Sequence, residues 1–105
     1  MYAVIRRYEG ADEEGLDELA RRVNAEFAPR LAELEGFHAY FVLRGEGGVI
    51  ASIGLFDTEE SAVRSSRLSG EWIRDAGLGS VLPNPPEVTA GEVIVERLAG
   101  ERVTQ

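Results

Sequence analysis

Residues 37–56 read FHAYFVLRGEGGVIASIGLF, two apolar runs on either side of a glycine-rich turn. The runs 37–44 and 49–56 are rich in the aromatic and β-branched residues that favour strands. Because residues 45–48 leave room only for a tight turn, we predict that the two strands pair antiparallel as a hairpin. The turn has no lysine and no helix is predicted directly after it, so it is not a phosphate-binding loop.

A strand and a helix are predicted before this hairpin. Tyr2 to Tyr8 has strand composition and ends at Glu9-Gly10. Asp12 is suited to cap the helix that follows. Pro29 has no backbone N–H, so we expect it to kink or split this helix near Glu26. The apolar positions with helical spacing are Leu16, Leu19, Ala20, Val23, Phe27, Leu31 and Leu34. Acid-before-base pairs at Asp17/Arg21, Glu18/Arg22 and Glu26/Arg30 are expected on the outer face.

A second helix and a last strand are predicted after the hairpin. Asp57, with Glu60 three residues later, resembles a capping box. The inward stripe of this helix is predicted to be Ala62, Ser66, Ser69, Trp72, Ile73 and Ala76. Glu87 to Leu98 is predicted as the fourth strand.

This order, β-α-β-β-α-β, is that of the ferredoxin-like α+β fold. We predict one domain, residues 1–98, with a four-stranded antiparallel sheet and two helices on one face. Residues 99–105 are predicted to be a polar tail. The first and third strands are expected at the centre of the sheet.

The hairpin strands are apolar on both faces, which predicts that both faces are covered. In the first of these strands, Phe37, Ala39, Phe41 and Leu43 are expected on one face, and Tyr40 and Val42 on the other. Two helices cover only one face of the sheet. An exposed apolar sheet favours association, so we predict a homodimer in which a second subunit covers the other face.

Charge and composition exclude several classes of protein. The formal net charge of −8 disfavours nucleic acid and anionic membranes as partners and is compatible with a small-molecule ligand. The absence of cysteine excludes disulfides, thiolate nucleophiles and cysteine-ligated metal sites. No secretory signal pattern opens the chain, and no apolar run of membrane-spanning length occurs, so a cytoplasmic location is expected.

Three stretches give the chain a resemblance to a known family. They are the opening YAVIRRY (2–8), the Phe27-Ala28-Pro29 break before GFHAY (36–40), and the late helix that begins DTEESA (57–62) and carries Trp72. Over residues 2 to 98 the chain resembles the antibiotic biosynthesis monooxygenase-like family of dimeric α+β barrel proteins. The resemblance implies a dimer with facing sheets and a cleft in each subunit between sheet and helices.

The resemblance also suggests a chemistry. Members of the family include cofactor-free oxygenases that act on polycyclic aromatic compounds, quinol monooxygenases and haem-degrading enzymes. The haem-degrading branch uses a helix-borne histidine, whereas the only histidine here, His38, lies on a predicted strand. Haem degradation is therefore not expected, and neither a metal nor another cofactor is implied. Trp72 matches the helix tryptophan that lines the cleft in these enzymes.

His38 and Tyr40 are the candidate catalytic residues. His38 has the residue type of a general base near neutral pH, but its position also suits an exposed residue at a strand start. Tyr40 lies two residues further on, so the two side chains are expected to share a face. With Ser52 from the neighbouring strand, they would place three polar groups in one cleft.

Trp72, Ser69 and Arg67 are the candidate binding residues on the second helix. An indole beside serines offers a stacking face and one N–H donor to a flat ligand, although Trp72 is equally suited to packing under the sheet. Arg67 would reach the cleft mouth or else remain a solvated helix charge.

Two further features allow alternative interpretations. Because Arg6 and Arg7 alternate sides, one of them must face a covered surface, where it pairs with Glu92 or Glu96 or binds an anionic ligand. The stretch Asn84-Pro85-Pro86 is rigid and would either close the cleft or contact the partner subunit.

Two functions follow. The first is a cofactor-independent monooxygenase-like protein acting on a small aromatic or quinol-type substrate. The second is a non-catalytic, small-ligand-binding or stress-associated dimeric module. The residues alone do not choose between an enzyme and a binding protein.

Overall fold

In the computed structural model, which describes residues 1–100, four strands form one antiparallel sheet in the order β2-β3-β1-β4. The strands are β1 (Tyr2–Tyr8), β2 (Phe37–Arg44), β3 (Ile50–Phe56) and β4 (Glu87–Glu92). The helices are α1 (Leu16–Arg22), α2 (Ala28–Ala32) and α3 (Glu59–Asp75). Three helical turns lie between these elements: Glu13–Gly15 before α1, Val23–Phe27 between α1 and α2, and Leu78–Ser80 between α3 and β4. The predicted ferredoxin-like α+β fold, with β1 and β3 at the centre, is confirmed.

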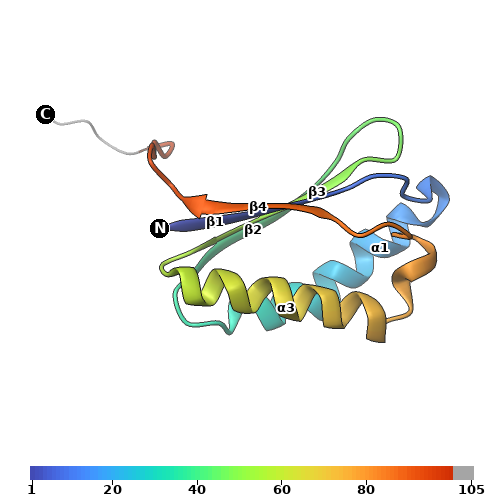
Figure 1. Cartoon of the computed structure of the whole chain (residues 1–105), viewed down its shortest axis with the longest axis horizontal. Helices are drawn as coiled ribbons and strands as arrows, with labels where there is room; N and C mark the ends of the chain where they lie inside the picture. Colours follow the sequence, from blue (N-terminus) through green and yellow to red (C-terminus); the bar gives the residue numbers. More distant parts are fainter. Residues whose placement is uncertain (101–105) are drawn as a thin grey trace, which may run out of the picture.

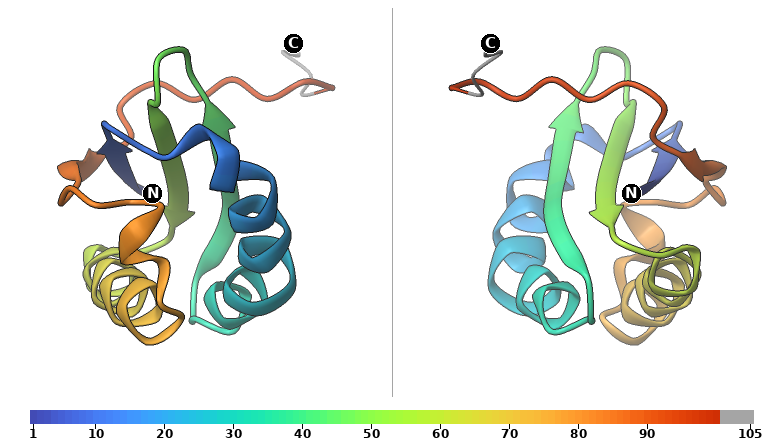
Figure 2. Two further views of the ribbon diagram at one scale, coloured as in Figure 1. Left: turned by 90° about the vertical axis from the view of Figure 1, so that its right-hand side faces the viewer. Right: turned by 90° about the vertical axis from the view of Figure 1, so that its left-hand side faces the viewer.

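All helices lie on one side of the sheet (Figure 1). Seen end-on, the α1–α2 segment lies under the β2 side and α3 under the β1–β4 side (Figure 2). The core lies between these layers, and its most deeply buried side chains are Phe56 and Leu31. No helix among residues 1–100 combines the length and the apolar character needed to cross a membrane.

The break predicted at Pro29 takes the form of a π-helical turn. Residues Val23–Phe27 form this wider turn, in which the Ala28 N–H reaches back to the Val23 carbonyl. Pro29 then sits in the first turn of α2, where no partner is needed for its missing N–H. The extra residue directs Phe27 into the core, where only 2 % of its surface is exposed.

The predicted facing of Phe37 is wrong because β2 contains a bulge. Phe37 pairs with Phe56, but Ala39 pairs with Leu55 and Tyr40 with Gly54, so His38 is the extra residue. Phe37 and Tyr40 therefore both face the helices, although their numbers differ in parity. His38 is exposed and contacts the Asp57 carboxylate.

The predicted start of the second helix is wrong by one residue. Thr58, not Asp57, is the N-cap, and its hydroxyl accepts a hydrogen bond from the Ser61 N–H at 3.2 Å. Ser61 and Ser65 are buried on α3, whereas Ser66 is only half-buried. The buried face of α3 is consequently richer in serine than predicted, and the predicted Ile73 and Ala76 pack partly buried against the core.

The fourth strand ends earlier than predicted, at Glu92 rather than Leu98. Its ladder partner β1 starts at Tyr2, and the last backbone hydrogen bond runs from the Val93 N–H to the Met1 carbonyl at 2.8 Å. Beyond this point the described chain has no strand left for β4 to pair with. Residues 93–100 run away from the domain (Figure 1) and leave Ile94, Val95 and Leu98 exposed. Of the predicted polar tail, residues 101–105 lie outside the described part of the chain.

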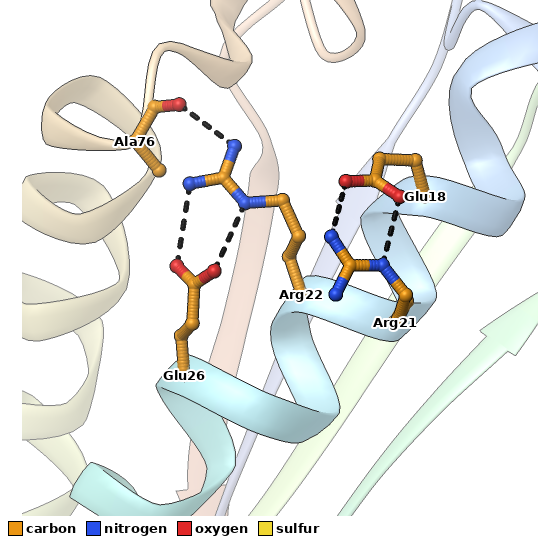
Figure 3. Close-up of polar contacts among 5 residues, drawn as sticks. All are labelled: Glu18, Arg21, Arg22, Glu26 and Ala76. Carbon is orange, nitrogen blue, oxygen red and sulfur yellow. Dashed lines mark hydrogen bonds and ion pairs between the residues drawn. The ribbon is translucent and has the colours of Figure 1, made fainter.

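Arg22 joins the two helical segments below the sheet (Figure 3). Its guanidinium donates to the Ala76 carbonyl at the end of α3 at 3.0 Å and forms a two-point ion pair with Glu26. Arg21 pairs only with the exposed Glu18. The predicted acid-before-base pairs are not formed. Arg21 pairs with Glu18 at a spacing of three residues, Arg22 pairs with Glu26 in the reverse order, and Asp17 pairs with Arg44 of β2.

Candidate ligand-binding groove

A groove of about 500 Å³ opens between the α1–π-turn segment and β2. Since β2 is the edge strand, no further strand of residues 1–100 covers this side of the helices. The helical wall is formed by apolar side chains with Asp17 and Asn24, and the strand wall by Tyr40, Val42, Arg44 and Ile50. Its volume lies in the range of small-molecule sites, so the groove is the candidate binding site.

Two small cavities adjoin the groove on its inner side. The first, about 30 Å³, lies between Trp72, Ser69 and Ser52, and the second, about 10 Å³, extends to Arg6 and Ser65. Tyr40 lines the groove and both cavities. It therefore lies between a ligand in the groove and the polar side chains of the inner cavities.

The phenol of Tyr40 is held in its protonated form. Burial is the main cause, and the nearby Tyr8 adds to it, while a hydrogen bond with Ser52 and the charge of Arg6 act in the opposite direction. Together they raise the pKa of Tyr40 to about 12. At neutral pH the group is a hydrogen-bond donor rather than a base.

Trp72 belongs to an aromatic cluster beside the inner cavity. Its ring stacks on Phe27, with centroids 5.3 Å apart, and Phe27 meets Tyr40 edge-on at 5.9 Å. Trp72 is 5 % exposed. Its indole N–H lies toward Glu26, whose carboxyl pKa is lowered by Arg22 in the first place and by Trp72 to a smaller extent. Trp72 thus lines the cavity with a ring that Phe27 already covers on one face.

Ser52 and Ser69 lie beside Tyr40, as part of the same inner cavities. Ser52 comes from the centre of the sheet and Ser69 from α3, and both are buried. The structure therefore brings together four of the six predicted site residues: Tyr40, Ser52, Ser69 and Trp72.

His38 and Arg67 lie elsewhere. The β2 bulge turns His38 away from the groove, so the expectation that it shares a face with Tyr40 is wrong. Arg67 is exposed on the outer side of α3, in a shallow depression with Glu59 and Glu60. Neither residue lines the groove or its inner cavities.

Arg6, rather than Arg7, faces the helices. It lies opposite Val88 in β4 and Ser52 in β3, so no acid of β4 stands beside it, and the predicted pair with Glu92 or Glu96 is not formed. Arg7 is exposed on the other face and pairs with Glu9. Asn84 donates from its amide to the Glu9 carbonyl at 3.0 Å, which ties its loop to the end of β1.

Asp17, Asn24 and Arg44 line the groove but were not predicted from the sequence. Arg44 donates to Asp17 at 3.0 Å, a bridge between β2 and α1 that spans 27 residues of sequence. Periodicity reports neighbours within one helix or strand, so no local signal reveals such a pair. Among residues 1–100, no group of three or more acidic or histidine side chains is placed to hold a metal ion.

Comparison with known proteins gives a result for structure but not for sequence. No protein-family model matches the chain, and no curated protein matches its sequence. A monooxygenase from the gene ActVA-Orf6 of Streptomyces coelicolor, in complex with nanaomycin D, superposes with a TM-score of 0.72 at 14 % identity, over 94 % of this chain and 92 % of that one. The chain has the fold of this monooxygenase.

Two further solved structures share the fold. The NE2512 protein of unknown function from Nitrosomonas europaea has a TM-score of 0.71 at 19 % identity, with 95 % of each chain covered. A protein from Chloroflexus aurantiacus is described as an antibiotic biosynthesis monooxygenase. It has a TM-score of 0.63 at 20 % identity, covering 94 % of this chain and 98 % of that chain. The resemblance to the antibiotic biosynthesis monooxygenase-like family is confirmed for the fold, which by itself does not assign a reaction.

Proposed function

We propose that the protein is a cofactor-independent monooxygenase-like protein that acts on a small aromatic or quinol-type substrate held in the groove. The observation that carries the proposal is the position of Tyr40, a protonated phenol on the wall of the groove and of both inner cavities. The fold shared with monooxygenases supports it.

The chemistry relies on the substrate as its own reductant. An aromatic substrate, once deprotonated, gives an electron pair to dioxygen in two steps and forms a peroxide at carbon. Breakdown of the peroxide leaves one oxygen atom as a new carbonyl and releases the other as water. The protein binds the planar substrate, excludes bulk water and donates a hydrogen bond from Tyr40 to the oxygen on which negative charge develops.

Three observations favour the alternative, a ligand-binding module without catalysis. His38, the only histidine, lies outside the groove, and Tyr40 remains protonated at neutral pH. Within the part of the chain that the structure describes, Asp17 is the one carboxylate on the groove wall, and it pairs with Arg44. The groove is thus better suited to binding a ligand than to removing a proton from it.

Oxygen consumption distinguishes the two functions. We expect turnover with members of an anthrone and quinol panel, loss of that turnover in Tyr40→Phe, and retention in His38→Ala. Tyr2→Phe is the matched control, since Tyr2 lies outside the groove. No oxygen uptake by the wild type, together with saturable quenching of Trp72 fluorescence by the same compounds, would favour the binding module.

The proposal includes a homodimer acting in the cytoplasm. The sheet face opposite the helices exposes Phe41 at 57 %, Leu43 at 47 % and Ile5 at 39 %. Residues 94–98 follow β4 and pair with no strand of the described chain, which leaves Ile94, Val95 and Leu98 exposed. A second subunit would cover the face and supply the missing partner.

A further inference from the structure

Arg6 is a cation directed into the space between sheet and helices. It stands at the centre of the sheet, directly across from Ser52. Its Nε donates to the Tyr8 hydroxyl at 3.3 Å, and its guanidinium lies 6.0 Å from the Tyr8 ring centroid. Within residues 1–100 it forms no ion pair with a carboxylate. An unpaired charge in a partly buried position is unfavourable unless something compensates for it.

The surroundings of Arg6 offer hydroxyl groups and no negative charge. No aspartate or glutamate of the described chain lines either inner cavity. Ser69 is only 9 % exposed and lines both cavities. The Ser65 hydroxyl is occupied by the Ala62 carbonyl at 2.7 Å. A chain with a net charge of −8 thus keeps a cation beside two buried serines, Ser52 and Ser69, between its sheet and its helices.

The size of the space restricts what can bind there. A cavity of about 10 Å³ adjoins Arg6, which is about the smallest that holds a water molecule or one oxygen atom. A phosphate or sulfate group is too large for it. The groove next to it, at about 500 Å³, accommodates a planar ring system.

We infer that Arg6, Ser52 and Ser69 form a site for one anionic oxygen of an aromatic ligand, the phenolate or enolate oxygen of a compound lying in the groove. This inference rests on the proposed function, which supplies the aromatic nature of the ligand. It adds that the bound ligand carries a negative charge. The guanidinium keeps its charge at any pH that the protein encounters. It favours the deprotonated ligand, while the Ser69 hydroxyl donates to the same oxygen. In the monooxygenase reaction, the site would lower the pKa of the bound substrate, so that the groove needs no strong base.

Anaerobic binding of a matched pair of compounds tests the site without turnover. The probes are 4-nitro-1-naphthol, which is a naphtholate in mildly alkaline buffer, and its neutral methyl ether. Calorimetry should give the wild type at least about tenfold higher affinity for the naphtholate, the effect expected of one charge-assisted hydrogen bond. Equal affinities, or no binding of either compound, would overturn the inference.

Variants separate the local site from the general charge of the protein. Arg6→Met should bind both compounds equally, whereas Arg7→Met, the same change on the opposite face, should keep the preference. Ser69→Ala should weaken naphtholate binding and leave ether binding unchanged. If Arg6→Met does not fold, Arg6→Lys and Ser69→Ala carry the test, with a reduced preference expected in both. A preference that survives in the Arg6 and Ser69 variants contradicts the inference.

The binding experiment tests the oxyanion site separately from the proposed monooxygenase reaction. If the wild type prefers the naphtholate but consumes no oxygen with any substrate, the oxyanion site stands and the monooxygenase function fails. If oxygen is consumed but Arg6→Met leaves the naphtholate preference unchanged, the site fails and the proposed function stands.

Discussion

Tyr40 shows how its surroundings make one side chain a candidate site residue. In the sequence it is a tyrosine in an apolar strand, two residues after the only histidine. In the structure it lines the groove and both inner cavities, and burial raises its pKa to about 12. His38, which has the residue type of a catalytic base, lies outside the groove. The position of a side chain relative to the groove, and not its residue type, makes Tyr40 rather than His38 the candidate site residue.

Tyr40 should make the protein less stable in strong alkali. Its folded-state pKa of about 12 exceeds the ordinary value of 10.0, so the unfolded chain ionises first. The stabilising contribution is full below about pH 10 and is lost as the pH rises toward 12. Denaturant midpoints measured across this window should fall more steeply for the wild type than for Tyr40→Phe. Identical slopes for the two proteins would show that Tyr40 ionises normally, and Tyr2→Phe serves as the control.

The helices illustrate how contacts between elements override local pairing. Local spacing predicts three ion pairs along the first helix, but Arg22 instead reaches the Ala76 carbonyl at the end of α3 (Figure 3). A cation near a helix C-terminus satisfies a carbonyl that has no partner within the helix. Arg22 therefore helps to hold the two helical segments together, whereas the adjacent Arg21 forms only a surface pair.

Replacing Arg22 should destabilise the fold, and replacing Arg21 should not. Arg22→Ala removes the bond to Ala76, a loss of about 1 kcal/mol in the free energy of unfolding. Arg21→Ala, one position away, should give no resolvable change, because its pair with Glu18 is exposed to solvent. Chemical denaturation of both variants measures the difference, and equal effects would contradict the proposed role of Arg22.

The same variants differ in acid. The hydrogen bond from Arg22 is the main reason that the pKa of Glu26 is lowered. The stabilisation from a depressed carboxyl pKa is present above the ordinary range and is lost as the pH falls through the folded value. The difference in the free energy of unfolding between the wild type and Arg22→Ala, measured by chemical denaturation, should therefore become smaller as the pH is lowered.

The whole domain has one covered and one uncovered sheet face. The helices bury one side, and on the other side Ile5, Phe41 and Leu43 remain exposed. Residues 93–98 have the composition of a strand, yet β1 offers them no partner beyond Met1. Both features are explained if two copies join through their sheets.

Light scattering at micromolar concentration should give the mass of a dimer. Phe41→Glu places a charge on the open sheet face and should produce a monomer. Val63→Glu, at a position of similar exposure on α3, should remain dimeric. A monomeric wild type would refute the dimer, and so would dissociation of the two variants to the same extent.

The element order, the hairpin, the amphipathic first helix and the break at Pro29 follow from sequence alone. Each is written in local signals: strand composition, a glycine turn, helical spacing and a missing N–H. These signals also give Tyr40, Ser52, Ser69 and Trp72 as polar or aromatic residues of interest. They determine which elements form and in what order.

The tertiary structure decides the facing of Phe37 and His38, because the bulge in β2 depends on how this strand pairs with β3. It also places Arg6 opposite Val88 rather than beside an acid, and it leaves residues 93–98 without a partner strand. The bridge between Asp17 and Arg44 is likewise a meeting of distant segments. Such contacts depend on strand register and on where each strand runs out. Because register is a relation between segments far apart in the chain, the residue pattern within a single segment does not contain it.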